Sequence, residues 1–290
     1  MPAADLEISP GLVRDLLAAQ HPDLVALPVA FFANGWDNAL FRVGDHLVAR
    51  LPRRALGAEI IRNEQRWLPR LAPALPIPTP YPERIGAPAL GYPWSWSLVP
   101  YLPGEPAGVT ELDWAATATA MGAFLRALHV PAPDDAPANP FRGVWVGERK
   151  DSFLKNLDTA GPRVDRGAAL RVWREAVSAP RFAGPPVWLH GDLHPLNILV
   201  SDGEVSAVID FGDITAGDPA TDLAVAWHLL PLSHHEAFWA AYGRADGALR
   251  ARARGWALRL GMVFMAFSAD NPMMLAIGER TVGRVLAPGN

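Results

Sequence analysis

The sequence predicts a two-lobed α+β protein rather than a chain of alternating βαβ units. Short apolar runs typical of strands, with a helical segment among them, fill the first third of the chain. Long segments with helical periodicity dominate the rest, and two strand-like runs around a polar loop interrupt them near residue 190. A segment containing Pro and Gly, residues 100–104, separates the two parts. We therefore expect lobes of residues 1–102 and 103–290.

The first lobe is expected to contain an antiparallel sheet. Gly44 and Asp45 join two strand-like runs, which indicates a tight hairpin with Gly at its first central position. The segment 73–93 is too rich in Pro for a regular element. The predicted helices are 9–20 and 58–71, and the predicted strands are 29–32, 39–43, 46–51 and 94–99.

The second lobe is expected to be mainly helical. Thr110 with Asp113 three residues later resembles a capping box, as does Ser233 with Glu236. Residues 131–140 are mostly Pro, Ala and Asp, which indicates an exposed loop or insert. The predicted helices are 110–128, 152–156, 167–177, 221–230, 233–242, 248–269 and 272–285.

The composition excludes several classes of protein. Half of the chain is hydrophobic and 19% is charged, so a sizeable core can form. The net charge of −4 argues against a nucleic-acid partner, and the absence of cysteine removes disulfides, thiolate nucleophiles and zinc–thiolate sites. No signal peptide or membrane-spanning run is evident, so we expect a cytoplasmic protein without a membrane partner. The sequence does not indicate the oligomeric state.

The chemistry is expected at the polar loop within residues 188–200. It reads H-x-D-x-x-x-x-N through His190, Asp192 and Asn197, and the apolar run after it ends in D-F-G, beginning at Asp210. In phosphoryl transfer, the first Asp of this pattern receives the proton of the acceptor hydroxyl, while the Asn and the DFG Asp hold Mg²⁺.

These motifs resemble those of the aminoglycoside phosphotransferase family, kinase-like enzymes that act on small molecules. The resemblance rests on HGDLHPLNILV, VIDFGD and GDPATDLA, and it weakens after about residue 245. It implies a bilobal protein-kinase-like fold, ATP or GTP as phosphoryl donor, Mg²⁺, and a small-molecule hydroxyl as acceptor.

By the matching positions, the resemblance assigns Asp192 as catalytic base and Asn197 and Asp210 as metal ligands. It makes His190 and Asp222 supports of the catalytic loop. A histidine at a strand end is more often structural than catalytic, which agrees with that role for His190. We expect His194 to support the loop too, with a direct role in catalysis as the alternative.

Nucleotide-binding residues are expected in the first lobe. Asn34, Gly35 and Asn38 lie in a segment similar to the family's phosphate loop, although protein kinases have three glycines there. No lysine precedes residue 150, so Arg50 takes the place of the phosphate-binding lysine, and Glu64 is expected to brace it. By analogy with the family, backbone groups near Val99 and Tyr101 contact the base.

For the acceptor, an aminoglycoside-type antibiotic is our first expectation. Residues 103–290 hold 21 acidic and 17 basic residues, which is compatible with a cationic acceptor. Asp270 and Glu279 are the acids that would favour an amine. If apolar side chains of the last helices face the site, a macrolide is the alternative. A choline- or homoserine-type metabolic kinase and a non-enzymatic nucleotide-binding module remain open.

Overall fold

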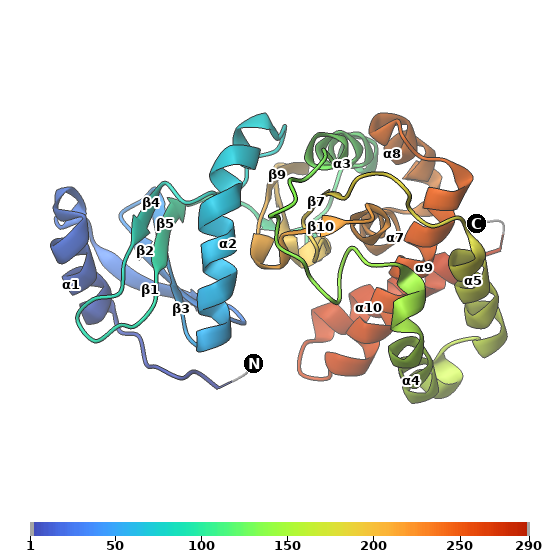
Figure 1. Ribbon diagram of the computed structural model, residues 1–290, viewed down its shortest axis with the longest axis horizontal. Coiled ribbons are helices and arrows are strands. Elements are labelled where there is room, and N and C mark those ends of the chain that lie inside the picture. The colour runs from blue at the N-terminus through green and yellow to red at the C-terminus, as the bar shows by residue number, and fades with distance from the viewer. Residues whose placement is uncertain (1–2, 289–290) are drawn as a thin grey trace. The chain divides into compact units, whose positions relative to one another are not determined.

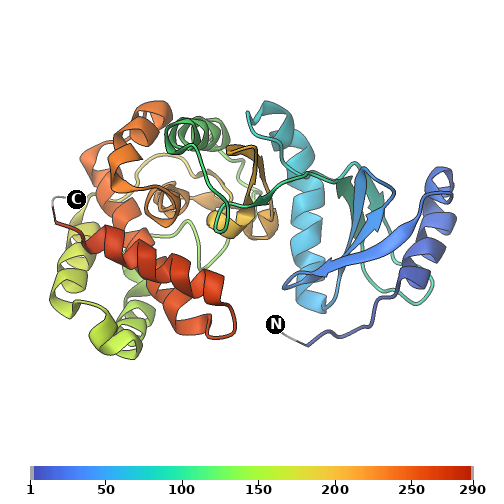
Figure 2. The ribbon, with the colours of Figure 1, turned by 180° about the vertical axis from the view of Figure 1, so that it is seen from behind.

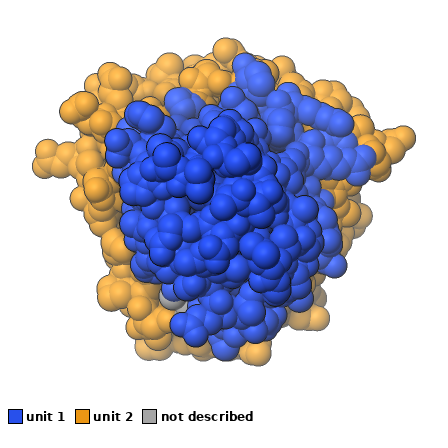
Figure 3. Space-filling model, turned by 90° about the vertical axis from the view of Figure 1, so that its left-hand side faces the viewer, with its two compact units in different colours: residues 1–73, 78–103 blue, residues 74–77, 104–290 orange. Residues whose placement is uncertain are grey.

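The computed structural model describes residues 3–288 and has the predicted α+β fold, with an antiparallel sheet in the N-terminal region and a helical C-terminal part (Figure 1). The chain forms two compact units, which Figure 3 colours separately. Unit 1 comprises Met1–Pro73 and Pro78–Pro103, and unit 2 comprises Ala74–Ile77 and Gly104–Asn290. Among the described residues, no helix is long and apolar enough to cross a membrane.

Unit 1 is built on a five-stranded antiparallel sheet in the order β1-β2-β3-β5-β4. Its strands are β1 (Val29–Asn34), β2 (Asn38–Val43), β3 (Leu47–Pro52), β4 (Arg84–Gly86) and β5 (Trp96–Pro100). Its helices are α1 (Pro10–Gln20) and α2 (Ala55–Leu71).

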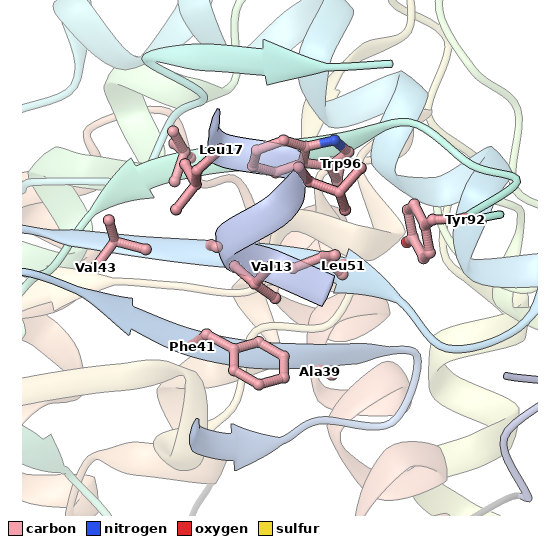
Figure 4. Close-up of a cluster of buried hydrophobic side chains, with 11 residues drawn as sticks. Val13, Leu17, Ala39, Phe41, Val43, Leu51, Tyr92 and Trp96 are labelled. Atoms are coloured by element: carbon pink, nitrogen blue, oxygen red, sulfur yellow. The ribbon is translucent and has the colours of Figure 1, made fainter. Parts of the chain in front are cut away.

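The core of unit 1 lies between α1 and the sheet (Figure 4). Val13 and Leu17 point from α1 toward Phe41 of β2 and Trp96 of β5, and all four side chains are buried. Ser9 begins the helix, since its hydroxyl accepts a hydrogen bond from the N–H of Leu12 at 3.2 Å. Burying such side chains stabilises the unit by roughly 1.5–3 kcal/mol each.

Two details of unit 1 differ from the sequence-based predictions. The β2–β3 hairpin has a loop of three residues rather than two, because Val43 pairs with Leu47. Gly44 has a φ of 60° there, which glycine adopts without a steric penalty. The Pro-rich segment also contains the short strand β4, a stretch of three residues without proline, which pairs with β5 at the edge of the sheet.

Unit 2 combines helices with two small antiparallel sheets, β10-β7 and β6-β8-β9. Its helices are α3 (Trp114–Leu128), α4 (Lys150–Ala160), α5 (Arg166–Ser178), α6 (Ala220–Leu223), α7 (Val225–Leu229), α8 (His235–Tyr242), α9 (Gly247–Phe267) and α10 (Pro272–Leu286). Its strands are β6 (Glu105–Pro106), β7 (Val187–Leu189), β8 (Ile198–Ser201), β9 (Glu204–Val208) and β10 (Thr215–Gly217). Short 3₁₀ turns across both units are Pro22–Leu24, Ala72–Ala74, Val146–Arg149, Gly161–Arg163, Pro195–Asn197, Phe211–Asp213 and Leu232–His234.

Helix α9 is the central helix of unit 2 and packs against α4, α5 and α10 (Figures 1 and 2). Glycines permit the close approach. A Cβ on Gly255 would lie 2.3 Å from the Cβ of Ala176 on α5, and a Cβ on Gly278 of α10 would lie 2.7 Å from the carbonyl oxygen of Gly261. The backbones of α9 and α10 therefore touch at this point.

Both capping boxes predicted for unit 2 were wrong. Asp113, not Thr110, caps α3, because its Oδ1 accepts hydrogen bonds from the N–H groups of Ala115 and Ala116. Ser233 does not cap α8, and its hydroxyl bonds to Nδ1 of His234 instead. The predicted helix over 221–230 is divided into α6 and α7 at Ala224.

Candidate active site

The polar loop at residues 190–197 connects β7 to β8 in unit 2. Each strand has its own antiparallel partner, β10 for β7 and β9 for β8, so both ends of the loop are held by sheets. Asp222 on α6 fixes the start of the loop. Its carboxylate accepts hydrogen bonds from the N–H groups of His190 at 2.7 Å and Gly191 at 2.9 Å. Asp222 is thus a buried structural acid that binds backbone.

His190 is fully buried and links the loop to the end of β9. Its Nδ1 accepts a hydrogen bond from the N–H of Asp192, and its Nε2 lies 2.9 Å from the carbonyl oxygen of Ile209. These partners require a neutral ring with the proton on Nε2. Because Ile209 precedes Asp210, the imidazole holds the two acidic positions of the motif in a fixed relation.

His129 also takes part in this support, which the sequence did not indicate. It lies at the C-terminal end of α3 and is buried, with Nδ1 at 3.0 Å from the hydroxyl of Tyr242 and Nε2 at 3.3 Å from Oδ2 of Asp222. The ring therefore orients the carboxylate that holds the loop.

Asp192 contacts two basic side chains within unit 2. Its Oδ1 accepts a hydrogen bond from Nη2 of Arg142 at 3.0 Å, and its Oδ2 lies 3.4 Å from Nε2 of His194. Burial by itself would raise the pKa of Asp192, but the hydrogen bonds and positive charges of His194 and Arg142 outweigh it and hold the pKa well below its usual range. The carboxylate is therefore ionised at neutral pH.

Asn197 and Asp210 form a donor set that suits Mg²⁺. The amide nitrogen of Asn197 donates to the carbonyl oxygen of Asp192 at 2.9 Å, and within residues 3–288 its Oδ1 accepts no hydrogen bond. Asp210 is exposed at the end of β9, where the N–H of Ile209 donates to the carbonyl oxygen of Asn197. Mg²⁺ commonly takes one or two protein oxygens and completes its shell with water and phosphates. The described residues contain no cluster of three or more His, Cys, Asp or Glu that could hold a metal.

The segment 131–140 is a largely exposed loop, as predicted, but Asn139 within it and Arg142 just after it contact the polar loop and Asp213. Nε of Arg142 donates to the carbonyl oxygen of Gly191 at 2.7 Å, and the amide of Asn139 donates to Asp213 at 2.9 Å. Gly191 has a φ of 88°, and a Cβ there would lie 2.3 Å from the carbonyl oxygen of Asp213. Burial and the charges of Asp192 and Asp210 raise the pKa of Asp213, against the influence of Arg142 and Asn139.

In unit 1, Arg50 of β3 and Glu64 of α2 form a buried two-point ion pair. Nη1 of Arg50 bonds to Oε2 of Glu64, and Nη2 lies 3.0 Å from Oε1. Glu64 is completely buried, whereas Glu59 lies on the exposed side of the helix. The guanidinium and the carboxylate match as planar forks, which a lysine could not reproduce.

The segment predicted as a phosphate loop is the turn between β1 and β2. Asn34 is exposed, Asn38 is buried, and the N–H of Gly35 donates to the carbonyl oxygen of Asn38 at 2.8 Å. Arg54 pairs with Asp37 in this turn, with Nε 2.7 Å from Oδ1. The ion pair restrains a turn that has few glycines.

The predicted base-contacting segment follows β5. Val99 is buried in that strand, paired with Val48 of β3. The N–H of Tyr101 donates to the carbonyl oxygen of His46 at 2.7 Å, so this group is already engaged. The ring of Tyr101 lies under the guanidinium of Arg42, 3.4 Å from ring centroid to Cζ. Tyr92 and Trp96 belong to the core, as predicted for Trp96.

A comparison with protein families decides the assignment. The model of the phosphotransferase enzyme family (APH) matches residues 28–256, which is most of the chain and includes every motif described above. The chain belongs to the phosphotransferase enzyme family. It is therefore a kinase-type enzyme that acts on small molecules.

Solved structures of phosphotransferases share its fold. The GDP complex of aminoglycoside 2'-phosphotransferase-IIIa has a TM-score of 0.68 at 17% identity, over 96% of this chain and 99% of that chain. Macrolide 2'-phosphotransferase MphH from Brachybacterium faecium has a TM-score of 0.63 at 22% identity, over 94% and 97%. The streptomycin–ATP complex of APH(2")-IIa has a TM-score of 0.59 at 17% identity, over 94% and 95%. No curated protein sequence matches the chain.

Several side chains around the catalytic loop of this phosphotransferase had no signal in the sequence. Arg142 lies 50 residues before Asp192, beyond a Pro-rich segment without periodicity. Phe264 of α9 lies against His194, with ring centroids 5.7 Å apart, and also against His228, at 5.4 Å. The helical pattern predicted α9 but could not tell which of its faces meets the loop.

Proposed function

We propose that this phosphotransferase transfers the γ-phosphoryl group of ATP or GTP to a hydroxyl group of a small molecule, with Asp192 as the catalytic base. The observation that carries the proposal is the position of Asp192. It is an ionised carboxylate on a loop that Asp222, His190 and two sheets hold rigidly. Rigid support of this kind is what a catalytic group requires.

In the proposed reaction, the acceptor oxygen forms a bond to the γ-phosphorus while the bond from that phosphorus to the β–γ bridging oxygen breaks. The hydroxyl proton passes to Asp192. A carboxylate with a depressed pKa is a weak base, so its main task is to orient the hydroxyl, and it accepts the proton late, when the P–O bond is largely formed. Positioning, rather than base strength, is then the larger contribution.

Asn197 and Asp210 would hold Mg²⁺ in this proposal, and the ion would neutralise charge on the phosphates of the donor. In unit 1, Arg50 would bind the α- and β-phosphates in place of a lysine, with Glu64 as its brace. Asn34, Gly35 and Asn38 would approach the phosphates, and the chain at Val99 and Tyr101 would approach the base. For Tyr101 this role falls to its carbonyl group, since its N–H is engaged.

Aminoglycoside-type antibiotics are the reference acceptors, because three of the similar structures carry an aminoglycoside in their titles. The acids predicted to bind an amine, Asp270 and Glu279, are both exposed on unit 2. Macrolides are the second class. Phe267 and Met273, at the turn between α9 and α10, are 70% and 46% exposed, and such apolar side chains suit a bulky apolar alcohol.

The experiment that tests the proposal is an assay of nucleotide-dependent phosphorylation with a panel of aminoglycosides, macrolides, choline, homoserine and hydroxy acids. We expect transfer to at least one class, and we expect Asp192→Asn to abolish it while nucleotide affinity is retained. Asp202→Asn, at an exposed turn of the same unit, is the matched control and should keep full activity. Nucleotide binding without transfer to any acceptor would favour a regulatory nucleotide-binding module, and full activity of Asp192→Asn would reject the assigned base.

A further inference from the structure

Arg259 on α9 is a buried cation without an anion. The residue is 6% exposed, and both Nε and Nη1 of its guanidinium are buried without a hydrogen-bond partner. Within residues 3–288 it forms no ion pair, and its described contact is with the ring of Trp256, 5.4 Å from centroid to Cζ. Lysine and arginine are almost never buried unless they are paired. A ligand that supplies the missing acceptors would explain this arrangement.

Further positive charge surrounds Arg259 rather than the acids that a structural arginine would need. Arg149 also has a buried, unpartnered Nε and no ion pair within the described part of the chain, and its guanidinium lies over the exposed ring of Phe141. Burial, and then the charges of Arg142 and Arg149, lower the pKa of Arg259 to about 10. Of these three arginines, Arg142 alone has a carboxylate partner within residues 3–288, and that partner is Asp192.

Arg142 connects this group of charges to the polar loop. It is hydrogen-bonded to Asp192, and its charge lowers the pKa of Arg259 more than the charge of Arg149 does. Five residues after Arg259 on α9, Phe264 packs against His194 of the loop. The helix that carries the unpaired guanidinium is thus the helix that lies against the residues proposed for transfer.

We propose that Arg259, assisted by Arg149, binds an acidic group of the acceptor, a carboxylate or a phosphate ester, and that the phosphotransferase therefore acts on an anionic small-molecule alcohol. This inference rests on the proposed function and names its substrate class. A guanidinium presents parallel N–H donors that match the two oxygens of such a group. An aminoglycoside, with its ammonium groups, would meet like charge at Arg149 and Arg259 and is disfavoured by the same observation.

An added anion could also bind where the phosphates of the donor nucleotide bind. The test must therefore distinguish that site from the site at Arg259. Thermal unfolding is measured without nucleotide and at constant ionic strength. The compounds added, one at a time, are inorganic phosphate and the matched set gluconate, sorbitol and glucosamine. We expect phosphate and gluconate to raise the Tm of the wild-type protein, and sorbitol and glucosamine to have little effect. Arg259→Met should lose the increase, Arg259→Lys should keep part of it, and Arg250→Gln, at a partly exposed position on the same helix, should keep all of it.

The variant is expected to fold, because methionine replaces an unpaired buried charge with an apolar chain of similar length. A Tm of Arg259→Met far below that of the wild type, with unchanged anion effects, would show a structural role and overturn the inference. An anion effect that Arg259→Met retains but the double variant Arg50→Met with Glu64→Leu loses would place the anion at the donor site and overturn the inference as well.

Turnover distinguishes this inference from the proposed function. In the acceptor panel we expect hydroxy acids or phosphate esters to be phosphorylated, with a KM that rises at least tenfold in Arg259→Met and a KM for ATP that does not change. Phosphorylation of aminoglycosides alone, unaffected by Arg259→Met, would overturn the inference and leave the phosphotransferase proposal intact. Loss of anion binding in Arg259→Met without turnover on any acceptor would support the anion site and reject the proposed transfer.

Discussion

The guanidinium of Arg142 lies 3.0 Å from the carboxylate of Asp192 and also donates to the carbonyl oxygen of Gly191. One side chain thus holds both the proposed base and the backbone beside it. Asp192 is 31% exposed, so the ion pair does not close off the carboxylate. Arg142 therefore acts as a positioning residue and, after His194, helps to keep the pKa of Asp192 low.

Replacing Arg142 tests this relation through the pH profile. We expect Arg142→Met to reduce kcat/KM at neutral pH roughly 10- to 100-fold, because the base loses its orientation. The pKa of Asp192 should rise, so the acidic limb of the profile, below which the base is protonated, should move to higher pH. In Arg142→Lys, the acidic limb should return closer to its wild-type pH than kcat returns to its wild-type value. A profile of Arg142→Met that keeps the wild-type limb would contradict the assignment.

The Arg50–Glu64 pair can be tested only if its two charges are removed together. Glu64 is fully buried, and removing one partner would leave the other uncompensated at a cost of about 3–5 kcal/mol. We expect the double variant Arg50→Met with Glu64→Leu to fold and to raise the KM for ATP about 10- to 100-fold, as expected for a lost hydrogen bond to a charged group. Steady-state kinetics at saturating acceptor measures this effect. An unchanged dependence on ATP would make the pair purely structural.

His228 should make the protein less stable in acid. It is 1% exposed with Nδ1 at 3.2 Å from the hydroxyl of Thr281, and burial, followed by the charge of His194, lowers its pKa from 6.5 to about 3. Between these values the unfolded chain binds a proton that the native state excludes. The free energy of unfolding therefore falls by about 1.4 kcal/mol for each pH unit below 6.5.

Urea unfolding between pH 7 and pH 4 measures this slope. His228→Asn can keep the bond to Thr281 and should flatten the slope by about that amount, while the partly exposed His234→Gln serves as control. Burial also lowers the pKa of His235, to about 4. This residue destabilises the protein in acid in the same way, so some dependence of stability on pH should remain in His228→Asn. Equal slopes for the wild type and His228→Asn would show that His228 is not the cause.

Two glycines of α10 provide a matched test of the contact between α9 and α10. A Cβ at Gly278 would lie 2.7 Å from a backbone oxygen, so we expect Gly278→Ala to destabilise the protein by about 1–3 kcal/mol. Gly283 on the same helix has nothing within 4 Å of its virtual Cβ, so Gly283→Ala should stabilise by about 0.5–1 kcal/mol. Thermal or urea unfolding of both variants gives the two signs. Equal effects would mean that the helices are less closely packed than described.

The comparison of predicted and observed elements shows where local sequence is informative. The strand-like runs at 39–43 and 46–51 and the helical spacing in 114–128 predicted the strands and the helix, because such patterns reflect which side chains of an element are buried. The predictions failed at ends and turns. At Thr110, at Ser233 and in the Gly44 loop, small differences in backbone geometry choose between competing hydrogen bonds.

The sequence by itself determined the family, the α+β class and the spacing of Asp192, Asn197 and Asp210, because these depend on residue types within a short stretch of chain. Only the tertiary structure decided which side chains surround them. Arg142 contacts the loop from far along the chain, and Arg259 of α9 is close enough to feel the charge of Arg142, although no sequence period indicates either relation. Whether an arginine finds a carboxylate or stays unpaired depends on that packing, and the pairing in turn controls the ionisation of the base and the charge offered to a substrate.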